Sequence, residues 1–200
     1  MTRILLIRHG STDLLGRVLY GRMPGVFLNA EGRRQTGELA STLKARYSLD
    51  KIVSSPLERA IETAELIANA TGTAITIDDG ITEVDSGLWT GKTFEHLNAL
   101  DHWQRYNRRR SLTCPPGGET MMDVQSRSWR AIQKMIHLED TSSETCALVT
   151  HGDVIRCLLL LFLGMSIDHI HRLEIAPASV TEVNLGPYGP KVNCLNGVFY

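Results

Sequence analysis

The sequence has no long hydrophobic run and no excess of charge of one sign. Its most apolar stretch, residues 157–164, is far shorter than the roughly 20 residues that a membrane-spanning helix needs. The 200 residues carry a formal net charge of −1. Nothing therefore attracts the chain as a whole to nucleic acid or to an anionic membrane, and any basic site must be local. We expect neither nucleic acid nor a membrane as a partner.

Paired cysteines and a signal segment are missing as well. The sequence has four cysteines and no C-x-x-C pair among them, namely Cys114, Cys146, Cys157 and Cys194. Scattered thiols favour reduced side chains over a disulfide framework or a zinc site. Only Met-Thr-Arg precedes the first apolar run, which is too early and too short for a secretory signal. These features predict a cytoplasmic protein.

Patterns of strands and helices alternate along the chain, with no internal repeat and no low-complexity segment. Helices are expected over residues 31–47, 57–70, 119–138 and 153–163, and strands over 4–7, 51–55, 73–77, the apolar part of 144–154, and 179–185. Strands that alternate with helices indicate a mainly parallel sheet that is covered on both faces. The predicted fold class is α/β, a three-layer α/β/α sandwich.

The middle of the chain is less regular. Residues 94–110 are expected to contain a helix, and the prolines and glycines of TCPPGGET, residues 113–120, predict a loop. No linker divides the sequence. We therefore predict a single domain over residues 1–200, with a small lid insertion at about residues 90–118.

Four segments place residues suited to phosphoryl chemistry at strand ends or helix starts: IRHG, SSPLERA, ITEVDSGLWTG and VTHGD. Arg8 and Arg59 are planar donors that bind phosphate oxygens in pairs. His9 and His151 are nucleophiles or hydrogen-bond partners at neutral pH. Glu83 could give a proton to a leaving oxygen.

Each of these residues also has a structural interpretation when it is taken alone. A histidine at a strand end is often structural, and a lone Glu83 is often a solvated turn residue. Arg59 could pair with Glu58 or Glu62 on one helix surface. The joint order and spacing of the four segments favours the functional interpretation.

This order of segments resembles the histidine phosphatase superfamily, the phosphoglycerate mutase-like or branch 1 family, over almost the full length. LLIRHGST is similar to the family's first signature, GRMPGVFLNAEGRRQT to the segment that follows it, and VSSPLERAIETAE to the second signature. ITEVDSGLWTGKTFEHL, PPGGET and VTHGDVIRCLL complete the match.

The resemblance implies a phosphomonoesterase that acts on a small phosphorylated metabolite without metal or cofactor. His9 would form a phosphohistidine that water then hydrolyses. Arg8, Arg59 and His151 would stabilise the charge of the transferring group. Glu83 would serve as general acid and then as base. The residues expected to bind substrate are Arg8, Ser11, Thr12, Gly21, Arg59, Glu83, His151 and Gly152.

The glycine and the loop after His9 carry two further expectations. Gly10 is expected to let the backbone turn close to the ligand. Family members often have Glu at the position of Ser11 and Trp-Asn where this chain has Leu14-Leu15. Because Leu15 cannot hydrogen-bond, either Ser11 or Thr12 replaces the missing phosphate contact or turnover is weaker. The alternative for Thr12 is a structural role, in which its hydroxyl only caps the loop.

Two other functions fit the same pocket. The resemblance implies that mutases of this family are longer chains, in which extra segments seal the pocket. A length of 200 residues therefore favours a phosphatase. A cofactor-dependent phosphoglycerate mutase is one alternative. A protein that binds a phosphorylated ligand without turnover is the other.

The expected lid is rich in arginine, with Arg105, Arg108, Arg109 and Arg110 close together. Either they form a solvated helix end, or one or two of them, with Arg17 or Arg22, contact a carboxylate or second phosphate on the substrate. His169 and His171 are interpreted as structural, and no histidine has convincing metal-ligand spacing. The family resemblance also allows a homodimer.

Overall fold

The computed structural model describes residues 2–135 and 144–199, and a sheet of six strands lies at its centre in the order β4–β3–β6–β1–β7–β8. Neighbours among the first four strands run parallel, whereas β7 is antiparallel to β1 and β8 to β7. The strands are β1 (Thr2–Arg8), β3 (Lys51–Ser54), β4 (Ile75–Ile77), β6 (Thr145–Thr150), β7 (Val180–Gly186) and β8 (Gly189–Gly197).

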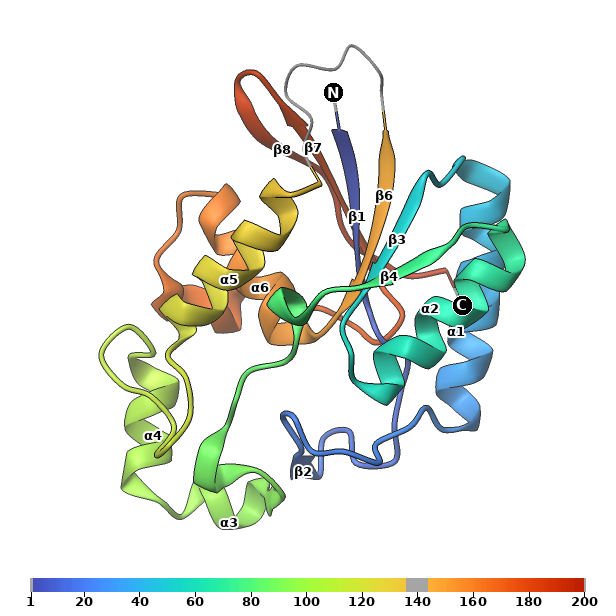
Figure 1. Cartoon of the computed structure of the whole chain (residues 1–200). Coiled ribbons are helices and arrows are strands. Elements are labelled where there is room, and N and C mark those ends of the chain that lie inside the picture. Colours follow the sequence, from blue (N-terminus) through green and yellow to red (C-terminus); the bar gives the residue numbers. More distant parts are fainter. Residues whose placement is uncertain (1, 136–143, 200) are drawn as a thin grey trace.

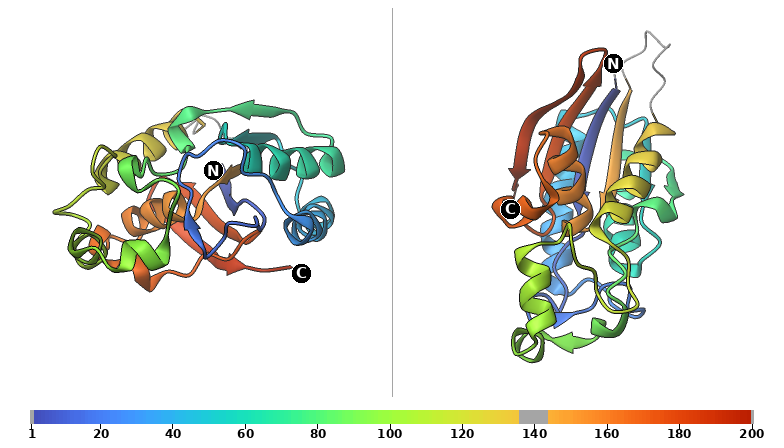
Figure 2. Two further views of the ribbon diagram at one scale, coloured as in Figure 1. Left: turned by 90° about the horizontal axis from the view of Figure 1, so that it is seen from below. Right: turned by 90° about the vertical axis from the view of Figure 1, so that its left-hand side faces the viewer.

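Helices cover both faces of this sheet (Figures 1 and 2). The first helical layer is α1 (Ala30–Arg46) and α2 (Glu58–Thr71), and the second is α5 (Met121–Gln133) and α6 (Gly152–Phe162). Successive side chains of a strand point to opposite faces, so an entirely apolar strand can support both layers. In β1, Leu5 and Ile7 pack with α1 and α2, whereas Ile4 and Leu6 pack with α5 and α6. The predicted three-layer α/β/α architecture is confirmed.

The expected helix limits agree with the structure to within about two residues, except at two places. Residues 94–110 form two helices, α3 (Phe94–Asn98) and α4 (Asp101–Arg108), in place of one. The helix expected over residues 119–138 begins at Met121 because the Thr120 hydroxyl and the Asp123 carboxylate form a capping box there. It ends at Gln133, and residues 136–138 of the expected helix lie outside the described residues.

The segment expected to form a lid lies beyond the carboxyl ends of the parallel strands (Figure 1). There, α3 and α4 are next to a two-stranded ribbon of β2 (Val18–Leu19) and β5 (Lys92–Thr93). The ribbon joins the loop after β1 to the start of residues 94–110, which we call the α3–α4 segment. Polar residues at the strand ends therefore face a partly covered space.

Gly10 permits a close approach between the loop after β1 and helix α1. A Cβ on Gly10 would lie 2.5 Å from the carbonyl oxygen of Gly32, and a Cβ on Gly32 would collide with the carbonyl of Ser11. Gly10 is not among the glycines with positive φ. These two glycines let the His9 loop lie directly on α1. That Gly10 also allows a turn close to the ligand stays a prediction.

We expect Gly32→Ala to lower the free energy of unfolding by roughly 1–3 kcal/mol, because the added methyl group must displace the Ser11 backbone. Gly37→Ala on the same helix is the matched control, since no atom lies within 4 Å of its Cβ position. The control should stabilise the protein by up to about 1 kcal/mol. Urea denaturation of both variants makes the comparison, and equal stabilities would contradict the packing argument.

Candidate active site

The sheet topology brings His9 and His151 together. Arg8 at the end of β1 is in register with Thr150 at the end of β6, and the two strands are parallel and adjacent. The residues that follow, His9 and His151, therefore leave the sheet side by side, with ring centroids 5.2 Å apart. Ligands bind at such carboxyl ends in α/β proteins.

The imidazole of His9 is fully buried and is held in one tautomer. Its Nδ1 lies 2.7 Å from the carbonyl oxygen of Gly10, which can only accept a hydrogen bond, so Nδ1 carries the proton. The Arg59 Nε–H donates to His9 Nε2 at 3.3 Å, which requires a lone pair on that nitrogen. Burial, Arg59 and Arg8 lower the pKa of His9 well below 6.5. His9 is thus a neutral imidazole with an unprotonated Nε2.

Arg59, in the first turn of α2, is completely buried. Its Nη2 donates to the carbonyl of Gly21 at 2.8 Å, and its guanidinium carbon lies 4.8 Å from the ring centroid of Tyr20. A cation over an aromatic face is attracted by the ring quadrupole. Gly21 and Tyr20 therefore fix the arginine beside His9.

Glu83 lies in the loop that follows the 3-10 helix Asp79–Ile81. One carboxyl oxygen accepts from the backbone N–H of Val84 at 2.9 Å, and the other lies 3.9 Å from His151 Nδ1. Burial, followed by the charge of Asp153, raises the pKa of Glu83 above 4.5. Glu83 therefore retains a proton at higher pH than an exposed glutamate does.

Three buried N–H donors around His9 lack a hydrogen-bond partner in the described part of the chain: Arg8 Nε, Arg59 Nη1 and His151 Nδ1. A buried donor without a partner costs free energy, so such groups usually serve a ligand or an ordered water. Two of the three belong to cationic guanidinium groups. The arrangement therefore suits an anion with several acceptor oxygens, such as a phosphoryl group.

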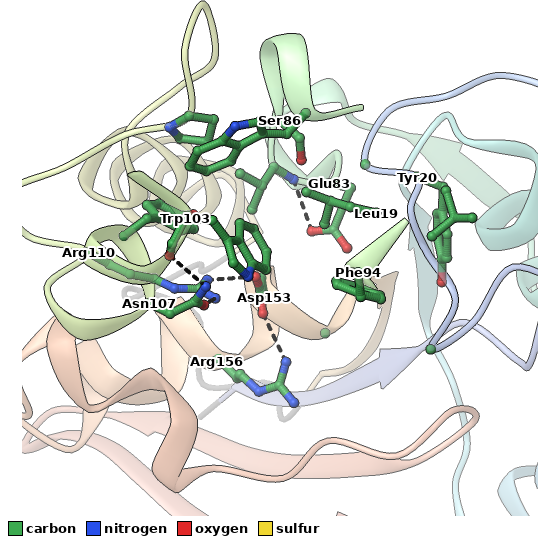
Figure 3. A pocket seen from close by; sticks show the side chains of 18 of the residues that line it. Leu19, Tyr20, Glu83, Ser86, Phe94, Trp103, Asn107, Arg110, Asp153 and Arg156 are labelled. Atoms are coloured by element: carbon green, nitrogen blue, oxygen red, sulfur yellow. Dashed lines mark hydrogen bonds and ion pairs between the residues drawn. The ribbon is translucent and has the colours of Figure 1, made fainter. Parts of the chain in front are cut away.

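A cavity of 270 Å³ is lined by one of these donors, Arg8, and by residues of the α3–α4 segment. Figure 3 shows Glu83 on the same cavity as Trp103 and Arg110. Four of the predicted residues line it, namely Arg8, Gly21, Glu83 and Gly152, and His9, His151 and Arg59 lie against them through the contacts above. Leu15, Leu19, Phe94 and Trp103 supply much of the apolar wall.

The sequence profile of the histidine phosphatase superfamily (branch 1) matches residues 4–197. The chain belongs to this superfamily. The family resemblance that the sequence indicated is thus confirmed, and it covers the whole of the cavity.

Relatives in the histidine phosphatase superfamily carry different names. Over 182 residues the chain is 36% identical to the "Bifunctional protein Rv2228c" of Mycobacterium tuberculosis, covering 90% of this chain and 49% of that protein. The chain thus spans about half the length of this relative. It is 30% identical to a glucosyl-3-phosphoglycerate phosphatase of Mycolicibacterium vanbaalenii (84% and 76% covered). It is 31% identical to a probable phosphoglycerate mutase GpmB of Salmonella choleraesuis (92% and 85% covered).

Two solved structures that resemble this chain have the same fold. YhfR of Bacillus stearothermophilus superimposes with a TM-score of 0.89 at 28% identity, covering 99% of this chain and 98% of YhfR. The phosphoserine phosphatase of Entamoeba histolytica in complex with 3-phosphoglyceric acid gives 0.85 at 27% identity, with 99% and 98% covered.

The loop residues that differ from the usual histidine phosphatase pattern do not line this cavity, apart from Leu15. The Ser11 hydroxyl lies 2.9 Å from Oε1 of Gln35, so it is engaged away from the site. The Thr12 hydroxyl is buried and has no partner among the described residues. Of the two hydroxyls expected to replace the missing asparagine, only that of Thr12 is unpartnered, and Thr12 does not line this cavity.

The structure also separates the arginines of the α3–α4 segment. Arg110 lines the cavity, but Arg105, Arg108 and Arg109 do not, and neither do Arg17 and Arg22. Arg22 instead bonds the carbonyl of Glu83 and the carboxylate of Glu119. Asp153, Arg156 and His171 line the cavity too. Sequence reasoning missed Asp153 and Arg156, although their i, i+3 spacing after His151 was a readable signal.

Ser55 fixes the orientation of His151. Both side chains are fully buried, and the Ser55 hydroxyl oxygen lies 2.7 Å from His151 Nε2. The backbone N–H of Leu57 points at the same hydroxyl at 3.4 Å, which leaves its own proton for Nε2. Burial, Arg59 and His9 lower the pKa of His151 well below 6.5. The neutral ring then carries its proton on Nδ1, which is the nitrogen without a partner.

We expect Ser55→Ala to move part of the His151 proton from Nδ1 to Nε2, because the donor to Nε2 is lost. Ser54→Ala is the matched control: Ser54 is equally buried, but its hydroxyl donates to the Ser55 carbonyl. Nitrogen-15 NMR of the histidine side chains distinguishes the tautomers. An unchanged His151 tautomer in Ser55→Ala would contradict this role of Ser55.

Within residues 2–135 and 144–199, no group of three or more His, Cys, Asp or Glu side chains could hold a metal ion. No helix there is long and apolar enough to cross a membrane.

Proposed function

We propose that the chain is a phosphomonoesterase that acts through a phosphohistidine at His9, without a metal, on a small phosphorylated metabolite. The cluster of buried, unpartnered donors around the unprotonated His9 Nε2 carries this proposal. Such donors stabilise the charge of a transferring phosphoryl group, and positioning plus charge stabilisation is most of what phosphoryl transfer demands. Phosphatase names among the relatives support the same conclusion.

In the first step of the proposed reaction, His9 Nε2 attacks phosphorus and the bond from phosphorus to the ester oxygen breaks. Glu83 donates its proton to the departing oxygen, and Arg8, Arg59 and His151 Nδ1 stabilise the phosphoryl oxygens. In the second step, the Glu83 carboxylate takes a proton from the water that attacks the phosphohistidine. Inorganic phosphate leaves and both side chains return to their initial state.

Phosphate release from a panel of small monoesters in EDTA tests the proposal. Release that persists in EDTA supports a metal-independent phosphatase, and the ranking of the panel starts to identify the substrate. Loss of all release in EDTA, with recovery on adding a divalent cation, would contradict it.

A phosphoglycerate mutase is the second candidate, which the relative named as a probable mutase favours. Interconversion of 2- and 3-phosphoglycerate that exceeds phosphate release would make the mutase the better description. Binding of a phosphorylated ligand with neither reaction would leave the third alternative and direct attention to Leu15.

The shifted pKa values of His9 and Glu83 predict activity over a broad range of pH. His9 must be unprotonated and Glu83 protonated in the first step. With ordinary pKa values of 6.5 and 4.5 few molecules would have both forms, but burial lowers the first pKa and raises the second. We expect the acid limb of kcat/KM well below pH 6.5, and an alkaline limb above 4.5 that Glu83→Gln removes. The pH dependence of kcat/KM measures both limbs, and an alkaline limb that persists in Glu83→Gln would contradict the assignment.

A further inference from the structure

Three charged residues outside the catalytic cluster, Arg110, Asp153 and Arg156, line the half of the cavity that would hold the leaving alcohol. We call them the charged group. Asp153 Oδ2 accepts from Arg110 Nη1 and Asp153 Oδ1 from Arg156 Nη1, both at 2.9 Å (Figure 3). Burial alone would raise the pKa of Asp153, but the two arginines hold it well below its ordinary value. The carboxylate is therefore ionised and bridges a guanidinium of the α3–α4 segment to one of α6.

Both arginines are held firmly by further contacts. Arg110, which is 7% exposed, also donates from Nη2 to Asn107 Oδ1 at 3.1 Å and lies 4.6 Å from the ring centroid of Tyr106. Arg156 donates from Nε to the carbonyl of Leu173 at 2.8 Å. Among the described residues, Arg156 Nη2 has no partner, and the side chain lines the cavity.

Gly152 connects this group to the phosphoryl site. A Cβ on Gly152 would lie 3.4 Å from Arg8 Nε and 3.4 Å from Arg156 Nη1. The two guanidinium groups therefore approach the same glycine from neighbouring positions. A phosphoryl group bound by Arg8 would therefore lie close to Arg156.

The charges of this group select among leaving alcohols. Arg8 and Arg59 already balance the two charges of a phosphate monoester. In the other half of the cavity, Arg110, Arg156 and the ionised Asp153 together carry a net charge of +1. A single carboxylate matches that charge, a second phosphate exceeds it, and a neutral alcohol leaves Arg156 Nη2 without an anionic partner.

We propose that Arg110, Asp153 and Arg156 form a leaving-group subsite that takes one carboxylate, with Asp153 as the residue that selects against a second phosphate. This proposal rests on the proposed function, because it assumes that a phosphomonoester occupies the donor cluster. It assigns the acidic-substrate role to Arg110 with Arg156, in place of Arg17 or Arg22.

Three phosphates with a three-carbon skeleton test the subsite: 3-phosphoglycerate, glycerol 3-phosphate and propane-1,3-diol bisphosphate. In the unmodified protein, kcat/KM for 3-phosphoglycerate should exceed that for each of the others by at least about 10-fold, as expected for a charge-assisted hydrogen bond. Arg156→Gln should bring the ratio of 3-phosphoglycerate to glycerol 3-phosphate to about one. Asp153→Asn should shift the preference toward the bisphosphate.

Arg130→Gln is the matched control, because Arg130 is exposed on α5 and outside the cavity. The proposal would be overturned if the ratio of kcat/KM for 3-phosphoglycerate to that for glycerol 3-phosphate were equal in Arg156→Gln and Arg130→Gln. A preference of the unmodified protein for glycerol 3-phosphate would also overturn it. Asp153→Asn leaves two arginines without their carboxylate and can fail to fold, so Arg156→Gln then carries the test.

Equilibrium binding separates this proposal from the proposed function. If no monoester is hydrolysed, calorimetry with 3-phosphoglycerate still reports on the subsite. Binding that Arg156→Gln weakens, and Arg130→Gln does not, would support the subsite in a protein without phosphatase activity. Equal binding of 3-phosphoglycerate and glycerol 3-phosphate would overturn it.

Discussion

His9→Ala is expected to lower kcat for every monoester by at least about 1000-fold, because the atom that attacks phosphorus is removed. The surrounding donors remain, since Arg59 is also held by the Gly21 carbonyl and the Tyr20 ring. The variant should therefore still bind inorganic phosphate. Steady-state kinetics and calorimetry measure the two effects separately.

His96→Ala is the control for this substitution, because His96 is an exposed histidine on α3. Its kinetics should equal those of the unmodified protein. Activity of His9→Ala within about 10-fold of the control would place the nucleophile elsewhere, since loss of a nucleophile has a far larger effect.

Glu83→Gln is expected to lower kcat/KM for alkyl phosphates by about 100- to 10,000-fold, the usual contribution of a general acid. An aryl phosphate with a good leaving group should lose much less, because a phenolate departs without a proton. The amide keeps the shape of the side chain but cannot titrate. Comparison of kcat/KM for the two substrate types therefore isolates the proton transfer from any change in binding.

Glu95→Gln is the matched control, because Glu95 is an exposed glutamate on α3 and lies outside the cavity. This substitution should leave kcat/KM unchanged for both the alkyl and the aryl phosphate. A loss in Glu83→Gln that is equal for alkyl and aryl phosphates would indicate a role in binding or folding, and would argue against Glu83 as the acid.

Much of this arrangement could be predicted because it depends on local patterns in the chain. The apolar strand before Arg8-His9 and its counterpart before His151 end at the same edge of the sheet, since β1 and β6 are parallel neighbours. Any strand order that paired them would bring both histidines together. The order of the motifs along the chain was therefore enough to predict the fold class and the central residues of the site.

Other features depend on tertiary contacts that no local pattern reveals. Ser11 is engaged by Gln35 of α1 because two glycines let the loop and the helix touch. Arg110 is buried against Asp153, whereas its neighbour Arg109 does not line the cavity, so the residues of one arginine run have different environments. Composition and periodicity cannot separate such neighbours. The ion pair between Arg110 and Asp153 of α6 does so.

The most direct test of the account is to look for phosphohistidine at His9 during turnover. Glu83→Gln mixed with an aryl phosphate is the best case, because the first step needs no acid while the second lacks its base. Rapid quenching under alkaline conditions followed by peptide mass spectrometry should find phosphate on His9, together with a burst of phenol. Turnover with no phosphate on His9, or with phosphate on another residue, would contradict the central claim.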